Sequence, residues 1–298
     1  MRLTRRRILT VLAALPAGSL PAFAVLPQPI RGQAMGAQVT LHLDHPEAAR
    51  LGGIALAEIR RLEGIFSLYL ADSALVRLNR EGRLDRPPPE LLECLTLCAA
   101  VHRASAGLFD PTVQPLWATL AQAHATGRAP DPARMAAARR RIGWDRVRFG
   151  PDRVMLDRGQ ALTLNGIAQG VVADRIAALL RQEGLEVGLI DAGEIVAVGS
   201  DWPVRVAGGP RLRLTDRSLA TSGPFGTVLD LDGRQGHILS PFEGAAAPRW
   251  RSVSVSAPRA ALADALSTAV CLMPDEAAIA AMVGPFAGAR VEDLAPVA

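Results

Sequence analysis

The sequence lacks lysine altogether, because all 33 basic residues among its 298 positions are arginine. A mechanism that depends on a lysine amine, as a Schiff base or a general base, is therefore excluded. Cysteine is scarce, with three residues, and a chain of this length does not need disulfides for its stability. Cys94 and Cys98 lie one helical turn apart in the apolar segment LLECLTLCAAVH. We interpret both as small core residues rather than as a disulfide or a metal-binding pair.

The N-terminal apolar stretch is too short to cross a membrane. It runs from Ile8 to Leu15 and is followed directly by proline and small residues, whereas a spanning helix needs roughly 20 apolar residues. We expect residues 1–24 to be a signal peptide that is cleaved after Ala24. The segment Thr4–Leu9 carries an arginine pair before a short apolar region, which favours a twin-arginine signal and a periplasmic location. An ordinary arginine-rich secretory leader is the alternative.

Without this leader the chain carries no net charge. Residues 1–24 hold four of the 33 arginines and no acidic residue, which leaves 29 basic and 29 acidic residues. The high isoelectric point of the whole sequence therefore gives no support for a nucleic-acid or membrane partner. The remaining residues, 25–298, are enough for one large domain, and we expect a single one.

The pattern of apolar residues predicts an α+β fold with mixed sheets and flanking helices. Alternation predicts a strand at Gln38–Leu43, and helical spacing predicts a helix over 46–66. The other expected elements are a helix over 90–106, a loop over 124–134, a helix over 135–142, a hairpin of strands 147–149 and 154–156, a strand at 162–164, a helix over 171–182, a strand at 187–190, a β-rich region up to 257, and helices over 259–273 and 275–283. Strands and helices do not alternate regularly, which favours α+β over a doubly wound sheet.

Asp264 and Thr268 are candidate metal ligands. They stand four residues apart on a predicted helix, so a carboxylate and a hydroxyl oxygen can converge on one point. Mg²⁺ prefers such oxygen ligands and takes one or two protein carboxylates, leaving positions for phosphate and water. The alternative is that Asp264 begins the helix and Thr268 bonds its own backbone, which spacing alone would favour.

Two further motifs carry residues suited to chemistry, and each is weak on its own. The turn Asn165–Gly170 joins a predicted strand to a helix, a place where backbone amides can bind phosphate, although such turns are common. His237 lies in a predicted β segment after a turn. Its side chain has a pKa suited to removing a proton from a hydroxyl near neutral pH, but a lone histidine is more often structural.

The order of these motifs resembles that of the ApbE-type FAD:protein FMN transferases over nearly the whole chain after the leader. The similar segments are Ala34–Gly36, Phe66–Tyr69 with Asp72–Ser73 and Leu78–Asn79, Leu108–Val113, Thr163–Gly170 followed by Asp174, Asp191–Ile195, Ala220–Phe225, Gly236–Ile238 with Pro241, and Asp264–Thr268. So many matches in one order are specific, although no single one is. The resemblance implies an ApbE-like, T-fold-related architecture.

The resemblance also implies roles for individual residues. The Gly166 carbonyl, Asp264 and Thr268 would bind Mg²⁺, and His237 and Asp264 would be catalytic. FAD would be surrounded by Met35, Tyr69, Leu108, Phe109, Asp110, Thr163, Gln169 and Ile238. The implied reaction is Mg²⁺-dependent transfer of FMN from FAD to a Thr or Ser hydroxyl of an exported or membrane acceptor flavoprotein, with release of AMP.

Two residues depart from the family pattern. The family's glycine turn usually begins with Asp and carries Lys or Glu before its last Gly, whereas this sequence has Thr163 and Gln169. Loss of these charges can weaken FAD binding or change the acceptor. One alternative is therefore a non-catalytic FAD-binding and delivery factor. A further alternative is an FAD diphosphatase that uses water as the acceptor and releases free FMN. Asn165 together with Gln169 is most similar to NosX-type members, which implies a link to nitrous oxide respiration.

Overall fold

The computed structural model describes residues 28–34, 36–199, 201–206, 208–226, 228, 236–244 and 248–297. The leader predicted at residues 1–24 lies outside this part of the chain, and so does Met35, one of the residues expected near FAD. Within the described part, no helix combines the length and the hydropathy needed to cross a membrane.

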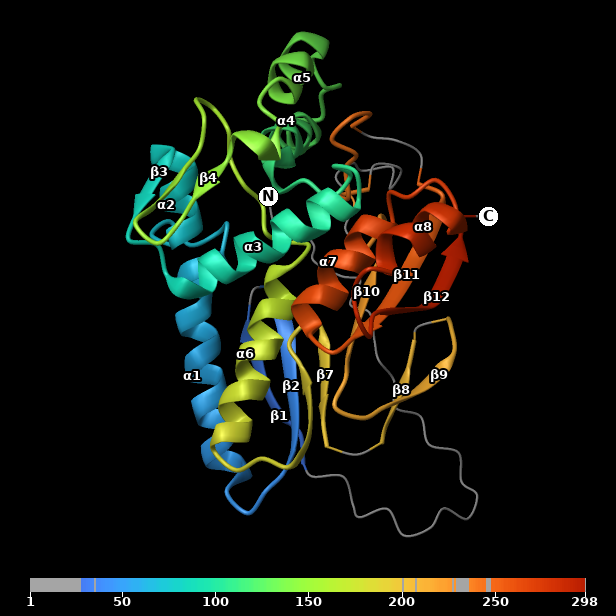
Figure 1. Cartoon of the computed structure of the whole chain (residues 1–298). Coiled ribbons are helices and arrows are strands. Elements are labelled where there is room, and N and C mark those ends of the chain that lie inside the picture. Colours follow the sequence, from blue (N-terminus) through green and yellow to red (C-terminus); the bar gives the residue numbers. More distant parts are fainter. Residues whose placement is uncertain are drawn as a thin grey trace.

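A seven-stranded sheet forms the centre of the fold (Figure 1). Its strands are, in spatial order, β1 (Ile30–Ala34), β2 (Ala37–Asp44), β6 (Val187–Asp191), β7 (Ile195–Val198), β10 (Ser218–Ser222), β11 (Trp250–Ala257) and β12 (Arg290–Pro296). Each neighbouring pair is antiparallel. The sheet with its covering helices matches the α+β fold predicted from the sequence.

Three helices cover one face of this sheet. They are α1 (Ala48–Phe66), α6 (Ala168–Gln182) and α7 (Ala260–Val270), and they pack on β1 and β2, on β6 and β7, and on β10 and β11. Figure 1 shows α1 and α6 side by side, and α8 (Glu276–Val283) follows α7. On β2, Val39, Leu41 and Leu43 alternate with polar residues and point into the core below the helices, as a half-buried strand requires.

The opposite face is partly covered by the hairpin of β8 (Trp202–Arg205) and β9 (Arg211–Leu214). Trp202 and Val204 pack there against Ile195 and Ala197 of β7. The intervening β7 residues point into the main core, so β7 is buried on both faces. Because both faces of β7 are buried, its sequence is a continuous apolar run.

A smaller region lies beside the main sheet. It contains a three-stranded sheet of β3 (Arg83–Asp85), β5 (Arg153–Met155) and β4 (Arg148–Phe149), with the helices α2 (Ala74–Glu81), α3 (Pro89–Ala104), α4 (Gln114–Ala125) and α5 (Pro132–Arg139). In Figure 1, α4 and α5 stand above the rest of the molecule, farthest from the main sheet. The loop expected over 124–134 is shorter than predicted, because these two helices extend into it.

The strand predicted at 162–164 is absent. The amide of Leu162 donates to Asn79 Oδ1 (2.7 Å), and its carbonyl accepts from Asn79 Nδ2 (2.8 Å). The amide of Thr163 donates to the Pro111 carbonyl (2.8 Å). A side-chain amide and a loop carbonyl therefore take the hydrogen bonds that a neighbouring strand would supply, which an apolar pattern cannot reveal.

Helices α2 and α4 and strands β1, β3 and β12 were not predicted from the sequence, whereas the interpretation of Cys94 and Cys98 as core residues is confirmed. Cys94 and Cys98 are free thiols buried in the main core, as is Cys271.

Candidate functional site

The N-terminal turn of α6 packs directly on α7. A Cβ atom at Gly170 would lie 2.5 Å from the carbonyl carbon of Ala260 and 2.6 Å from Cα of Ala261, so only glycine fits there. The Asp174 carboxylate, one turn further along α6, accepts hydrogen bonds from the amides of Ala260 (2.7 Å) and Ala261 (3.1 Å). It thereby satisfies amide groups at the beginning of α7 and fixes α7 against α6.

This packing carries Asp264 to the beginning of α6. Asp264 lies in the second turn of α7 with 3 % of its surface exposed, and its Oδ2 accepts a hydrogen bond from the Gly170 amide (3.1 Å). The interpretation of Asp264 as a residue that merely begins a helix is therefore wrong. Burial raises the pKa of its carboxyl to about 7, with the Gly170 hydrogen bond acting against the shift and the Asp174 charge adding to it.

Thr268 lies beside Gly166. A Cβ atom at Gly166 would lie 2.9 Å from Thr268 Oγ1, which places the glycine turn against this hydroxyl. Thr268 Oγ1 shares a hydrogen bond with Ser222 Oγ (3.2 Å), while the backbone carbonyl of Asp264 accepts from Ser267 instead. The structure thus brings together the three residues predicted to bind a metal, from helix α7 and from the turn before α6, about a hundred positions apart in the chain.

Two more carboxylates, which were not predicted from the sequence as site residues, belong to this region: Glu194 lies near Asp264, and Asp191 lies near Glu194. Burial raises the pKa of Glu194 well above its usual range, and the nearby charges of Asp264 and Asp191 add to that shift. Burial also raises the pKa of Asp191. None of the ion pairs between described residues includes any of these three acids. Both residues belong to the DAGEI segment of the predicted family pattern, and this membership was the feature of the sequence that could have marked them as site residues.

This arrangement fits a Mg²⁺ ion. Buried carboxylates without a basic partner are costly, and a divalent cation would offset that cost. Within the described part of the chain, no group of three or more histidine, cysteine or acidic residues is placed to hold a metal. A site with one carboxylate, one hydroxyl and one carbonyl suits Mg²⁺, which keeps several of its positions for water and phosphate. The Gly170 amide, which could otherwise bond the Gly166 carbonyl in a helix, donates to Asp264 instead.

The two residues that depart from the family pattern flank the same turn. The Gln169 side chain lies against Gly193, where a Cβ atom would be 2.6 Å from Gln169 Cδ. Gln169 is thus held between the beginning of α6 and the DAGEI segment. Thr163 Oγ1 accepts a hydrogen bond from the Asn165 amide (3.3 Å), so that it shapes the turn.

His237 is held in one orientation by a backbone contact. Its Nδ1 lies 3.0 Å from the Pro224 carbonyl, and its own amide donates to the same oxygen (3.0 Å). Because a carbonyl can only accept, Nδ1 carries the proton in this contact, and in the neutral ring this leaves the lone pair on Nε2. The neighbouring Ile238 is half-buried and packs against the main core.

The segment Leu108–Asp110 lies next to the glycine turn, because the Thr163 amide bonds the carbonyl of Pro111. Asp110 Oδ1 accepts from the amide (2.7 Å) and the hydroxyl (2.6 Å) of Thr112, and its Oδ2 accepts from the Trp144 amide (3.3 Å). This carboxylate therefore shapes the loop. Phe109 is buried and Leu108 is half-buried.

Tyr69, the only tyrosine of the chain, is 68 % exposed. Among the described residues, no hydrogen bond or ion pair joins Tyr69 or Asp110 to the three predicted metal ligands. The structure therefore places Thr268 against Gly166 and bonds Asp264 to the same glycine turn at Gly170, whereas it shows no comparable link from Tyr69 or Asp110 to these residues within the described part of the chain.

Comparison with known proteins identifies the family. A family model described as "ApbE family" matches residues 35–286, which is most of the sequence. The chain belongs to the ApbE family. The resemblance predicted from the sequence is thereby confirmed.

Curated relatives in the ApbE family carry the name FAD:protein FMN transferase. The one from Treponema pallidum (strain Nichols) is 30% identical over 248 residues, which cover 71% of this chain and 68% of that protein. The one from Klebsiella pneumoniae (strain 342) is 28% identical over 236 residues, 70% of this chain and 71% of that protein. The predicted class of enzyme, a flavin transferase, is confirmed by these matches.

Solved ApbE structures share the fold. The flavinyl transferase ApbE of Pseudomonas stutzeri superposes with a TM-score of 0.78 at 24% identity, covering 91% of this chain and 93% of that one. The ApbE protein of Thermotoga maritima gives a TM-score of 0.78 at 25% identity, covering 91% and 96%. The predicted ApbE-like α+β architecture is thus confirmed.

Proposed function

We propose that this chain transfers FMN from FAD to a Thr or Ser hydroxyl of an acceptor flavoprotein and releases AMP. The observation that carries the proposal is the contact between the beginning of α6 and α7, which gathers Gly166, Asp264 and Thr268. The names of the relatives support the flavin substrate and the protein acceptor. The leader expected at residues 1–24 supports a reaction in the periplasm with an exported or membrane acceptor.

In this proposal the beginning of α6 binds the diphosphate of FAD. The first amide groups of a helix lack partners within it, and they favour a negatively charged ligand. Gly166, Asp264 and Thr268 would hold Mg²⁺, which when bound neutralises charge on the phosphates. Gln169 offers an amide that both donates and accepts, so it can bond a flavin edge or a phosphate without a charge of its own.

His237 would act as the general base. Its Nε2 takes the proton of the acceptor hydroxyl as the hydroxyl oxygen forms a bond to the FMN phosphorus. The bond from that phosphorus to the bridging oxygen breaks, and AMP leaves with the bridging oxygen. The contact of Nδ1 with the Pro224 carbonyl keeps the ring in the tautomer that this step needs.

The test is incubation of the full chain with FAD, Mg²⁺ and a Thr-containing acceptor. We expect an acceptor heavier by one FMN, detected by mass spectrometry, and an equal amount of AMP. Removal of Mg²⁺ with a chelator and Asp264→Ala should both abolish transfer. His237→Gln should slow it by about 10²- to 10⁴-fold, the usual contribution of a general base. Thr268→Ser keeps the hydroxyl oxygen and should retain activity, whereas Thr268→Val should lose it.

The same experiment separates the two alternatives, a delivery factor, which the neutral residues Thr163 and Gln169 motivate, and an FAD diphosphatase that uses water as the acceptor. A delivery factor would bind FAD tightly in the wild type and in Asp264→Ala, with no AMP released by either. An FAD diphosphatase would release FMN and AMP without any acceptor. A cognate acceptor that remains unmodified would contradict the proposed function. The NosX-type assignment, with its link to nitrous oxide respiration, remains a prediction from Asn165 and Gln169.

A further inference from the structure

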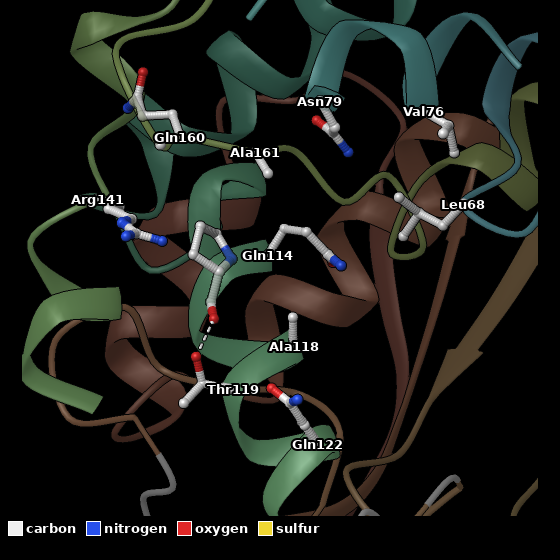
Figure 2. A pocket seen from close by; sticks show the side chains of 12 residues that line it. Leu68, Val76, Asn79, Gln114, Ala118, Thr119, Gln122, Arg141, Gln160 and Ala161 are labelled. Atoms are coloured by element: carbon white, nitrogen blue, oxygen red, sulfur yellow. Dashed lines mark hydrogen bonds between the residues drawn. The ribbon is translucent and has the colours of Figure 1, made fainter. Parts of the chain in front are cut away.

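A groove of about 460 Å³ lies between α2, the first turns of α4 and the segment that leads to the glycine turn (Figure 2). Its volume is in the range of ligand sites in proteins. Two lining residues, Leu68 and Ala161, are close in sequence to Tyr69 and Thr163 of the proposed flavin site. The groove therefore lies next to two of the residues expected around FAD, and none of the described residues expected there lines it.

One wall of the groove is fixed by internal hydrogen bonds. Asn79 uses both atoms of its amide on the backbone of Leu162. Gln160 accepts from the Asp157 amide (2.9 Å) and donates to the Gly143 carbonyl (2.8 Å). Because these side chains already make hydrogen bonds within the protein, the other polar residues of the groove are the ones available to bind a ligand.

Helix α4 offers two amides on one face. Gln114, Ala118 and Gln122 follow one another at four-residue intervals and all line the groove (Figure 2). Among the described residues, neither glutamine side chain makes a hydrogen bond. At 1.5 Å per residue the Cα atoms of the two glutamines are about 12 Å apart along the helix axis, the length of three to four residues of an extended chain. Each can pair with both a peptide N–H and a peptide C=O, and the small Ala118 leaves room for a backbone between them.

Arg141 places a positive charge in the groove. It is the only ionisable residue among those that line it, and no ion pair between described residues includes it. Its side chain lies over Gly159, where a Cβ atom would be 3.0 Å from Arg141 Nε and 3.4 Å from its Cζ. Gly159 has a φ of 79°, a conformation that strains residues with a side chain. Because glycine has no Cβ, the guanidinium of Arg141 can lie directly against its backbone.

We propose that this groove binds an extended segment of the acceptor protein that carries an acidic side chain toward Arg141. The inference rests on the proposed function, because that function supplies a protein acceptor. The two α4 amides match a peptide backbone, and Arg141 matches a carboxylate. A nucleotide is the less suitable occupant, since the lining residues include no aromatic ring on which a base could stack.

The test uses the full chain and two labelled peptides of equal length. Each contains one Thr, and they differ only in carrying Asp or Lys residues on one side of it. Fluorescence anisotropy should show that the Asp peptide binds at least about fivefold more tightly than the Lys peptide, a modest effect because Arg141 is exposed. Arg141→Glu should abolish this preference. Arg205→Glu, which makes the same charge change on the β8–β9 hairpin, should leave it intact, and FAD affinity should not change in either variant.

Each outcome decides the proposal. Equal binding of the two peptides, no binding of either, or an unchanged preference in Arg141→Glu would overturn it. Displacement of the Asp peptide by AMP would show that the groove is a nucleotide site instead. Transfer of FMN to the peptides is measured separately. Preferential binding without transfer would contradict the proposed function and not the groove, while equal transfer to both peptides would contradict the groove alone.

Discussion

Gly170 is the residue at which α6 comes against the backbone of α7, and its missing side chain permits the approach. We expect Gly170→Ala to lower the free energy of unfolding by about 1–3 kcal/mol, the usual cost of overpacking, because the new methyl group meets the backbone at Ala260 and Ala261. If α7 moves away from α6 to make room for this methyl group, Asp264 also moves away from the Gly170 amide, and we expect Mg²⁺ binding to weaken. Urea unfolding and calorimetric titration with Mg²⁺ measure the two effects.

Gly53 is the matched control for this substitution. It also lies inside a helix, α1, but no atom stands within 4 Å of a Cβ added there. Gly53→Ala should therefore stabilise the protein by about 0.5–1 kcal/mol, as alanine does at an open helical position. Similar destabilisation by both substitutions would mean that close approach to α7 is not what Gly170 provides.

At the scale of elements, α7 depends on a cap supplied by another helix. Asp174 of α6 bonds the amides of Ala260 and Ala261, and α7 carries two of the proposed metal ligands. Asp174→Ala should lower the free energy of unfolding by about 1–2 kcal/mol, in the range of a lost N-cap. It should also reduce Mg²⁺ affinity, because α7 is no longer fixed against the glycine turn.

Asp131 is a control for this substitution, because it caps a helix that carries no residue of the proposed site. It accepts from the Ala133 amide (2.9 Å) at the beginning of α5, which carries no proposed ligand. Asp131→Ala should cost similar or lower stability and leave Mg²⁺ affinity unchanged. If Asp174→Ala destabilises the protein but binds Mg²⁺ like the wild type, the cap does not position the site.

At the scale of the whole molecule, the main core joins α1, α3, α6 and α7 and encloses all three cysteines. Burial raises the pKa of Cys271 to about 12, and it also raises that of Cys98. Because the thiolate is the reactive form, we expect no reaction of the native protein with a disulfide reagent at pH 8. All three thiols should react after unfolding in denaturant. Rapid reaction of one thiol in the native protein would show that the core opens locally.

The sequence predicted the elements whose apolar residues repeat clearly. Helix α1, helix α6 and strand β2 were found because their buried faces follow one regular spacing. The strand expected at 162–164 was wrong because a side chain, Asn79, takes the place of a neighbouring strand. Helix α2 was missed because it has only eight residues, too few for its apolar positions to repeat over several turns.

For the site, the sequence by itself determined which chemical groups are present and in what order, and that order was enough to identify the family. It could not decide between a metal-ligand and a helix-terminus role for Asp264 and Thr268. Only the tertiary structure decided where the two residues lie, by placing Thr268 against Gly166 and by burying Asp264 near Glu194 in the second turn of α7; their role as metal ligands stays a prediction. The physical reason is that burial, close approach and the interaction of charges depend on distances between segments far apart in the chain, and spacing within one segment does not contain them.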